Sequence, residues 1–177
     1  MQKPIATHMD CARRILRYVS GTLDCGLLYR KGAILQLLGY TDADWAGDTI
    51  DRRSTSSFML NLGSAAISWS NKKQPTVMLS STEAEYRAVA VGTCEEIWLK
   101  RLLKDLQVTL SEPITVHCDN LSSIQLAKNP VFHARTKHIE VHYHFVQERV
   151  PRNEVYLRHV RTDQQVANIF MKPLGLD

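Results

Sequence analysis

The chain has 177 residues, of which 44% are hydrophobic and 23% charged, close to an average soluble globular domain. This composition excludes a disordered chain, a collagen or a coiled coil, and no apolar run approaches the ~20 residues that span a bilayer. The start lacks the apolar core of a secretory signal, so we expect an intracellular protein, cytoplasmic or nuclear, without membrane contact. No CxxC pair occurs, so we expect reduced, semi-buried thiols at Cys11, Cys25, Cys94 and Cys118.

The net charge of +4 is unevenly distributed along the chain. Residues 1–38 carry six Lys or Arg against two Asp, whereas residues 39–177 carry sixteen basic and sixteen acidic residues. The basic excess is therefore confined to the first fifth of the chain. Charge alone does not identify a nucleic-acid-binding protein, because a modestly basic isoelectric point is common in proteins that bind none.

The first half of the chain predicts one helix followed by strands. Apolar residues at helical spacing indicate a helix over 7–20, with Thr7 as its cap and Gly21 as its end. Short strands are expected over 26–30 and 35–41, then a hairpin of 55–62 and 65–70 around Gly63-Ser64. Residues 35–70 therefore predict three antiparallel strands.

The second half alternates helices with strands. A stripe of apolar residues that includes Ala84, Trp98 and Leu102 predicts a long helix over 82–106, capped by Ser81 or Thr82. The remaining predicted elements are strands over 114–118 and 155–160 and helices over 121–127, 138–150 and 162–170. The order βββαβααβα predicts an α/β fold with a mixed sheet, and the candidate boundary lies near Gly32. Trp45, Trp69 and Trp98 are expected in the core.

Three carboxylates occupy related positions in this predicted topology. Asp42 and Asp119 follow predicted strands, and Glu85 lies in the first turn of the long helix between them. If the two strands are neighbours, the three side chains converge at one edge of the sheet. Oxygen ligands favour Mg²⁺ or Mn²⁺, and a pair of such ions suits phosphodiester hydrolysis. Acidic residues after strands are also frequent turn formers or helix caps, so spacing alone leaves both interpretations open.

A longer series of motifs carries a family resemblance over about residues 35–175. In chain order they are Gly39-Tyr-Thr-Asp-Ala-Asp-Trp-Ala-Gly47, Arg52-Arg-Ser-Thr55, Ile67-Ser-Trp69, Lys72-Lys-Gln-Pro-Thr76, Ser80-Ser-Thr-Glu-Ala-Glu-Tyr-Arg-Ala88, Cys118-Asp-Asn120, Arg135-Thr-Lys-His-Ile139 and Ala167-Asn-Ile-Phe-Met-Lys-Pro-Leu174. This series resembles the RNase H domain of copia-type retrotransposon Pol polyproteins, most closely the plant elements. The resemblance divides the chain into residues 1–34, similar to the tail of a reverse transcriptase, and residues 35–177, an RNase H-like domain.

The resemblance implies a five-stranded mixed sheet flanked by helices and cleavage of the RNA strand of RNA–DNA hybrids. It implies two Mg²⁺ ions, for which Mn²⁺ is a possible substitute, held by Asp42, Glu85, Asp119 and a fourth residue. Asp44 stays open as an alternative to Asp42. Glu83 is better interpreted as a favourable charge at the start of the helix.

The fourth ligand position departs from the family pattern. Related elements carry Asp there, whereas this chain has Asn168, with Met171 in place of a Thr shortly after it. Asn168 keeps one carbonyl oxygen and loses a negative charge, so the site is either weakened or decayed. His159 lies nine residues earlier, where the resemblance implies a group that shuttles protons or product; a surface histidine at a strand end is the alternative.

Several basic residues are candidate contacts for the nucleic-acid backbone. Arg52, Arg53, Lys72 and Lys73 border the predicted hairpin, and the resemblance places Arg135, Lys137 and His138 near substrate. A solvated helix face is the alternative for the last three. His138 and His142 have the spacing of two zinc ligands on one helix. The segment lacks the Glu of an HExxH motif, and a third ligand would still be needed, so a zinc site is a poor interpretation.

Three functional hypotheses remain. The chain is a metal-dependent endonuclease for RNA–DNA hybrids, a binding module of the same fold that Asn168 has disabled, or an inert remnant of a Pol gene. A fold does not guarantee a chemistry. The expected partners are the hybrid and the reverse-transcriptase part of the parent polyprotein, and we expect a monomer with weak activity for the isolated domain.

Overall fold

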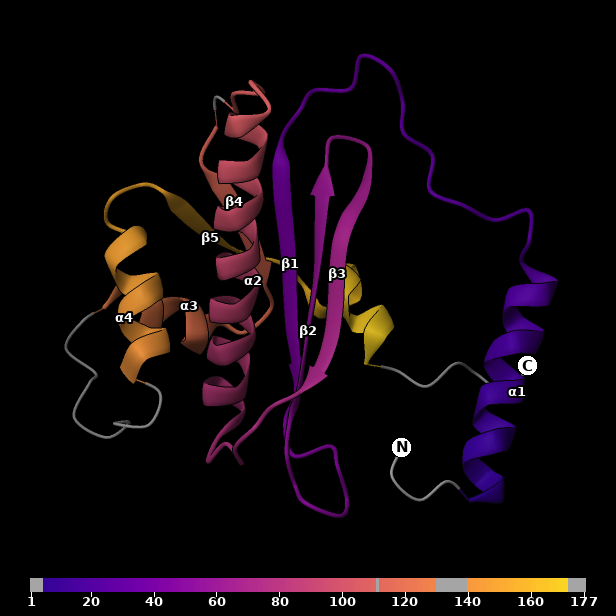
Figure 1. Cartoon of the computed structure of the whole chain (residues 1–177). Coiled ribbons are helices and arrows are strands. Elements are labelled where there is room, and N and C mark those ends of the chain that lie inside the picture. The colour runs from indigo at the N-terminus through magenta and orange to yellow at the C-terminus, as the bar shows by residue number, and fades with distance from the viewer. Residues whose placement is uncertain (1–4, 111, 130–139, 172–177) are drawn as a thin grey trace.

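The computed structural model describes residues 5–110, 112–129 and 140–171, the last range without the side chains of 140–143. Five strands form one sheet in the order β3-β2-β1-β4-β5 (Figure 1). Strand β1 (Leu37–Asp44) pairs antiparallel with β2 (Thr55–Leu62), which pairs antiparallel with β3 (Ala65–Lys73). On its other side β1 pairs parallel with β4 (Ile114–Cys118), which pairs parallel with β5 (Val155–His159). The predicted mixed α/β sheet is confirmed.

Helices cover the two faces of the sheet unequally. The long helix α2 (Ser81–Asp105) packs across β1, β2 and β4, and α3 (Leu121–Lys128) and α4 (Glu140–Arg149) lie beside it (Figure 1). Two 3-10 helices, η3 (Thr162–Gln164) and η4 (Val166–Phe170), follow β5, and η4 contacts β1 and β2 on the opposite face. The hydrophobic core therefore lies between the sheet and α2.

Close approach of α2 to the sheet depends on two glycines. A Cβ at Gly92 would lie 2.6 Å from Cγ2 of Thr41, and a Cβ at Gly39 would overlap the carboxyl group of Glu96. The buried core cluster that includes this interface contains Leu60, Tyr86, Val89, Leu99, Val116 and Leu157. The helix can therefore lie close to β1, the strand that carries Asp42.

The buried face of α2 differs from the predicted stripe. Ala84 and Ala88 are buried as expected, but Trp98 is 55% exposed and Leu102 38% exposed, while Glu96 is fully buried. Trp45 and Trp69 are likewise 51% and 56% exposed, so the expectation of three core tryptophans is wrong. Both errors have one cause: residue type does not reveal which face of an element the tertiary structure covers. The N-cap of the helix is Ser80, whose Oγ accepts from the backbone N–H of Glu83 at 3.2 Å, rather than Ser81 or Thr82.

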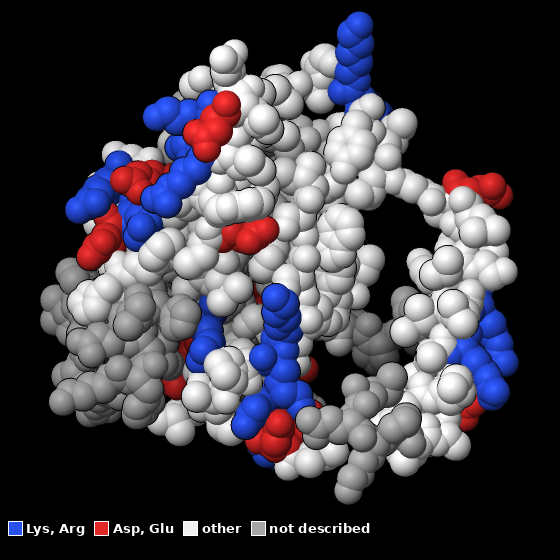
Figure 2. All heavy atoms as spheres, viewed as in Figure 1, with Lys and Arg blue, Asp and Glu red and all other residues white. Residues whose placement is uncertain are grey.

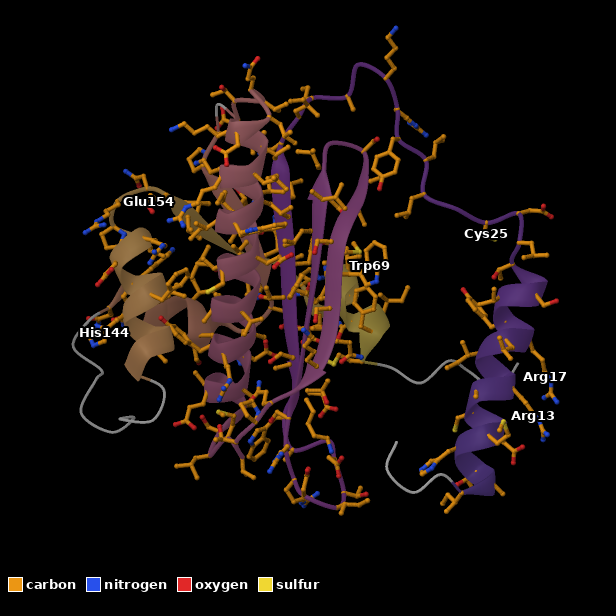
Figure 3. All side chains as sticks on the ribbon, viewed as in Figure 1. Arg13, Arg17, Cys25, Trp69, His144 and Glu154 are labelled. Carbon is orange, nitrogen blue, oxygen red and sulfur yellow. The ribbon has the colours of Figure 1, made fainter. Side chains whose placement is uncertain are left out.

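The N-terminal segment stands apart from the sheet. Helix α1 (Ala6–Gly21) has no buried residue, and Arg13 and Arg17 point away from the rest of the chain (Figure 3). Basic side chains line this outer side in the space-filling view (Figure 2). Its N-cap is Ile5, not Thr7 as expected. The expected strand over 26–30 is wrong: this stretch meets the sheet through Tyr29, whose hydroxyl donates to the carbonyl of Ala66 at 2.7 Å, and through the N–H of Arg30.

The end of the described chain is also less regular than expected. Instead of one helix over 162–170, η3 and η4 are separated by Gln165, whose backbone is extended. The buried side chain of Gln165 donates from Nε2 to the carbonyl of Thr41 at 2.9 Å and accepts from the N–H of Ala167 at 3.3 Å. This tie to β1 interrupts the helix. The division of the chain near residue 34 stays a prediction.

The cysteines are all free thiols, as expected, but not semi-buried ones. Cys118 is buried, whereas the other three are exposed. Among the described residues, no helix combines the length and apolar character that crossing a bilayer requires.

Candidate metal centre

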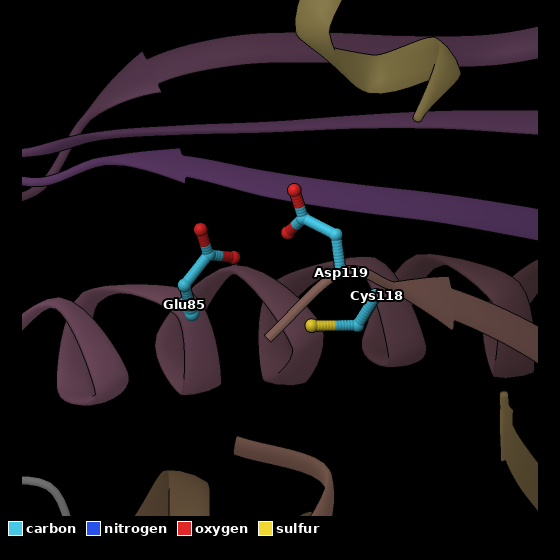
Figure 4. Close-up of side chains that lie close together, drawn as sticks. All are labelled: Glu85, Cys118 and Asp119. Carbon is cyan, nitrogen blue, oxygen red and sulfur yellow. The ribbon is translucent and has the colours of Figure 1, made fainter. Parts of the chain in front are cut away.

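Three carboxyl groups converge between β1, β4 and the N-terminal part of α2, where Glu85 lies just after the first turn and not within it as expected. A ligand atom of Glu85, of Cys118 and of Asp119 each lies within 4.8 Å of the other two. The carboxyl groups of Glu85 and Asp119 turn to the same side (Figure 4). Asp42 joins them: its carboxyl group interacts with that of Glu85, and the charge of Asp119 raises the pKa of both.

The placement of Asp42 differs in one detail from the expectation. It lies within β1, opposite Ser57 of β2, rather than after the end of the strand. Parallel pairing of β1 with β4 sets Tyr40 beside His117, so the chain continues to Asp42 and Asp119 at the same end of two neighbouring strands. The carboxyl groups of Asp42 and Asp119 therefore come together because of the pairing register of β1 and β4.

Burial and mutual repulsion make these carboxyl groups hard to ionise together. Burial raises the pKa of Glu85, and the charges of Asp42 and Asp119 raise it further. Burial also raises the pKa of Asp42, followed by the charge of Asp119. Like charges that share one site disfavour ionisation unless a cation joins them. The metal-free cluster therefore holds protons that a divalent cation would displace.

The donor set fits a hard divalent cation. Oε2 of Glu85 is buried, and no described residue gives it a hydrogen-bond partner, so it is an acceptor that a cation would satisfy. Magnesium and manganese prefer carboxylate oxygens, and zinc prefers nitrogen and sulfur. Although Cys118 lies in the cluster, burial and nearby carboxylates raise the pKa of its thiol far above the usual range. A neutral thiol is a poor ligand for Mg²⁺, so the three carboxylates form the best set.

Two alternative acidic residues are engaged elsewhere. Asp44 is in β1 opposite Thr55, and its carboxylate packs over Gly47, where a Cβ would come within about 2 Å of its oxygens. Glu83 accepts from the N–H of Leu79 at 2.9 Å through Oε2, which closes the start of α2 together with Ser80. The geometry favours Asp42 over Asp44, and it gives Glu83 a capping role.

Asn168 reaches the cluster through an intermediate residue. Its Nδ2 donates to the carbonyl of Thr162 at 3.0 Å, and Oγ1 of Thr162 donates to Oδ2 of Asp119 at 2.8 Å. The amide of Asn168 thus supports a residue that orients Asp119. An aspartate in its place could not donate this hydrogen bond. Thr162 is a contact that sequence analysis missed, and a Thr after a strand offers no distinctive signal.

The comparisons with known proteins agree with this geometry. The chain superposes on the N-terminal RNase H domain of a Mycobacterium tuberculosis protein with a TM-score of 0.55 at 12% identity, over 77% of this chain and 90% of that one. A foamy viral protease-reverse transcriptase in complex with an RNA/DNA hybrid gives 0.54 at 15% identity, over 99% of this chain and 21% of that one. These likenesses show the RNase H fold. No family model matches the chain.

Sequence relatives decide the family. The Pol polyprotein from transposon RE2 of Arabidopsis thaliana is 46% identical over 175 residues, which are 99% of this chain and 12% of that protein. The Pol polyprotein from transposon TNT 1-94 of Nicotiana tabacum is 40% identical over 173 residues, 97% of this chain and 13% of that protein. The chain belongs to the copia-type retrotransposon Pol polyproteins. It has their RNase H domain, as the motifs predicted, and spans about an eighth of the relatives' length.

Another predicted site residue of the RNase H domain lies on β5. His159 ends β5 opposite Cys118 and is exposed. No hydrogen bond joins it to a carboxylate of the described chain, so its role in proton transfer stays a prediction.

Of the basic residues near the hairpin that were predicted to contact nucleic acid, some already form ion pairs within the chain. Lys73 forms ion pairs with Asp48 and Asp51, and Arg53 pairs with Asp51 at 3.6 Å. Arg52 and Lys72 are exposed. Arg135, Lys137, His138 and His133 lie outside the described residues, as does the side chain of His142, so neither the substrate-contact prediction nor the zinc alternative can be placed on the structure.

Proposed function

We propose that this domain is a ribonuclease H that hydrolyses the RNA strand of RNA–DNA hybrids with divalent metal. The observation that carries the proposal is the cluster of Asp42, Glu85 and Asp119 on an RNase H fold, with a buried Glu85 oxygen that lacks a partner among the described residues. Such an arrangement is costly for stability without a cation, which is characteristic of a functional site.

The proposed ligands are Asp42, Glu85 and Asp119, with Asn168 at the fourth position, and Mg²⁺ is the expected ion with Mn²⁺ as a substitute. When bound, a metal pair supplies an activated water and stabilises the leaving oxygen of a phosphodiester. Thr162 orients Asp119 by the hydrogen bond described above. Helix α2, which Ser80 caps, carries Glu85 just after its first turn.

A second candidate function is supported by Asn168. Because it contributes no charge and its amide is engaged with Thr162, metal at the second position binds weakly, and the domain would then hold hybrid without cutting it. The proposed partners are the RNA–DNA hybrid and the reverse-transcriptase part of the polyprotein. The exposed apolar side chains of α1, such as Ile15, Leu16 and Val19, are suited to packing against that part.

The deciding experiment is a cleavage assay on a hybrid labelled on the RNA strand, with Mg²⁺ and then with Mn²⁺. Nuclease function predicts shortened RNA fragments that disappear in Asp119→Asn, and RNA–RNA or DNA–DNA duplexes of the same sequence should resist. Hybrid binding without cleavage by either ion would support the binding module instead.

A further inference from the structure

A second polar site lies beside the carboxylate cluster. It is a pocket of about 420 Å³ on the face of the sheet opposite α2, between β1, β4, β5 and η3. Its polar lining consists of Tyr40, His117, Arg158, His159, Arg161 and Gln164, all described by the structure and none acidic. A pocket rich in donors and free of carboxylates is suited to an anion.

The pairing register of β1, β4 and β5 brings together the side chains that form the floor of the pocket. Tyr40 of β1 stands beside His117 of β4, and His117 beside Arg158 of β5, so the three side chains line up across the sheet. The rings of Tyr40 and His117 stack with centroids 4.7 Å apart and an interplanar angle of 16°. Nδ1 of His117 lies 3.1 Å from the carbonyl oxygen of Gly39, which holds the ring in place. The floor is therefore a preorganised surface.

Two guanidinium groups supply the charge. Arg158 is exposed, and no carboxylate of the described chain forms an ion pair with it. Arg161 pairs with Asp163 at 3.1 Å, but side-chain exposures of 75% and 61% make this pair weak. Guanidinium groups bind phosphate oxygens in a bidentate manner, and a phosphate would compete successfully for Arg161.

The pocket adjoins the carboxylate cluster on two sides. Tyr40 precedes Asp42 by two residues on the same face of β1, a separation of about 7 Å along a strand. Arg161 is followed by Thr162, which donates to Asp119. The pocket is therefore within reach of a phosphate that neighbours one at the cluster.

We propose that this pocket binds a backbone phosphate of the nucleic acid close to the phosphate at the carboxylate cluster, with Arg158 and Arg161 as its ligands. The inference rests on the proposed function, because it assumes that an RNA–DNA hybrid occupies the cluster. The two arginines would position the strand and carry no base specificity.

The test is hybrid binding by Arg158→Ala/Arg161→Ala in an Asp119→Asn background, in which the hybrid stays intact. Fluorescence anisotropy in Mg²⁺ buffer across a salt series should show an affinity about 5–20-fold weaker and a salt slope shallower by about one to two, since each phosphate contact contributes ~0.9 to the slope. Arg158→Lys/Arg161→Lys should keep the slope and lose part of the affinity. Arg152→Ala, an exposed arginine before the opposite end of β5, is the matched control and should change neither.

A parallel titration distinguishes a pocket for a backbone phosphate from a pocket for free inorganic phosphate. Inorganic phosphate should shift the amide signals of Tyr40, His117 and Arg158 in nuclear magnetic resonance spectra, and the double alanine variant should not respond. If that response is lost while hybrid affinity and salt slope stay unchanged, the pocket takes free phosphate and the proposal is wrong. An unchanged response in both assays also overturns it. If the wild-type domain cuts no hybrid but the variant still binds hybrid more weakly, the pocket stands and the nuclease proposal fails.

Discussion

The carboxylate cluster and the predicted fourth ligand position, Asn168, are held in different ways. Asp42 and Glu85 are each 7% exposed and belong to β1 and α2, whose contact is among the most extensive in the core. Thr162 and Asn168 lie on short 3-10 helices and connect to the cluster through two hydrogen bonds. Helix–sheet packing therefore determines where the first group stands, and local hydrogen bonds determine the second. Changes in the first should abolish activity, and changes in the second should adjust it.

The largest effect is expected from Asp42→Asn. Removing one ligand charge from a site built of three carboxylates should lower hybrid cleavage on the order of 1,000-fold, comparable to the loss of a main transition-state contact. The measurement is the single-turnover rate at saturating Mg²⁺. Asp44→Asn is the matched control on the same strand, and its rate should stay within about threefold of wild type. Equal losses in both variants would mean that Asp44 shares the ligand role.

The next prediction concerns the stability of the metal-free domain. Folding raises the pKa of Asp42 and Glu85, so the folded state binds more protons than the unfolded state above about pH 4.5. The stabilisation is complete below that pH and is lost as pH rises through the folded pKa values. We expect the free energy of unfolding, from urea titrations in chelator, to fall by ~1–3 kcal/mol from pH 5 to pH 8.

Two controls sharpen this prediction. Glu85→Gln should flatten the decline, because an amide does not titrate. Saturating Mg²⁺ should restore stability at pH 8, since a ligand that binds only the folded state stabilises it. Stability that rises with pH in the metal-free wild type would contradict the proposed repulsion; buried Glu96, whose pKa is also raised by burial, contributes to the decline in every variant.

A smaller effect is expected at the fourth position. Asn168→Asp should raise cleavage at limiting Mg²⁺ by about 10-fold, because the added charge improves metal affinity by more than the lost hydrogen bond to Thr162 costs. The metal concentration at half-maximal rate should fall accordingly. Asn168→Ala should not reproduce the gain. An unchanged metal requirement in Asn168→Asp would show that this residue is not a weakened ligand.

The smallest effect is expected from Thr162→Val, which removes the hydroxyl that donates to Asp119 and keeps the side-chain shape. One hydrogen bond of this kind contributes about 0.5–1.5 kcal/mol, so the rate should fall about 3–10-fold. Thr162→Ser, which retains the hydroxyl, is the control and should stay near wild type. A loss of rate as large as that of Asp42→Asn would show that Thr162 matters as much for cleavage as the carboxylate cluster does.

Much of the fold could be predicted because its signals are local. The hairpin strand Thr55–Leu62 and the strand Ile114–Cys118 have the predicted bounds, since alternation and the adjoining Gly63 and Pro113 are properties of neighbouring residues. The closing helix was predicted wrongly because Gln165 bonds to Thr41, a contact across 124 positions. The buried side of α2 was wrong for a similar reason, since it depends on where the sheet lies.

The amino-acid sequence by itself determined the family, the order of the elements and the three carboxylates, because each depends on residue types and spacing along the chain. Only the tertiary structure decided that the carboxyl group of Asp42 lies beside that of Glu85, that Cys118 lies near Glu85 and Asp119, and that Arg158 and His117 share a pocket. These results follow from the register of β1, β4 and β5, which brings together side chains that are distant in sequence. Register is a property of the paired strands and not of any one of them.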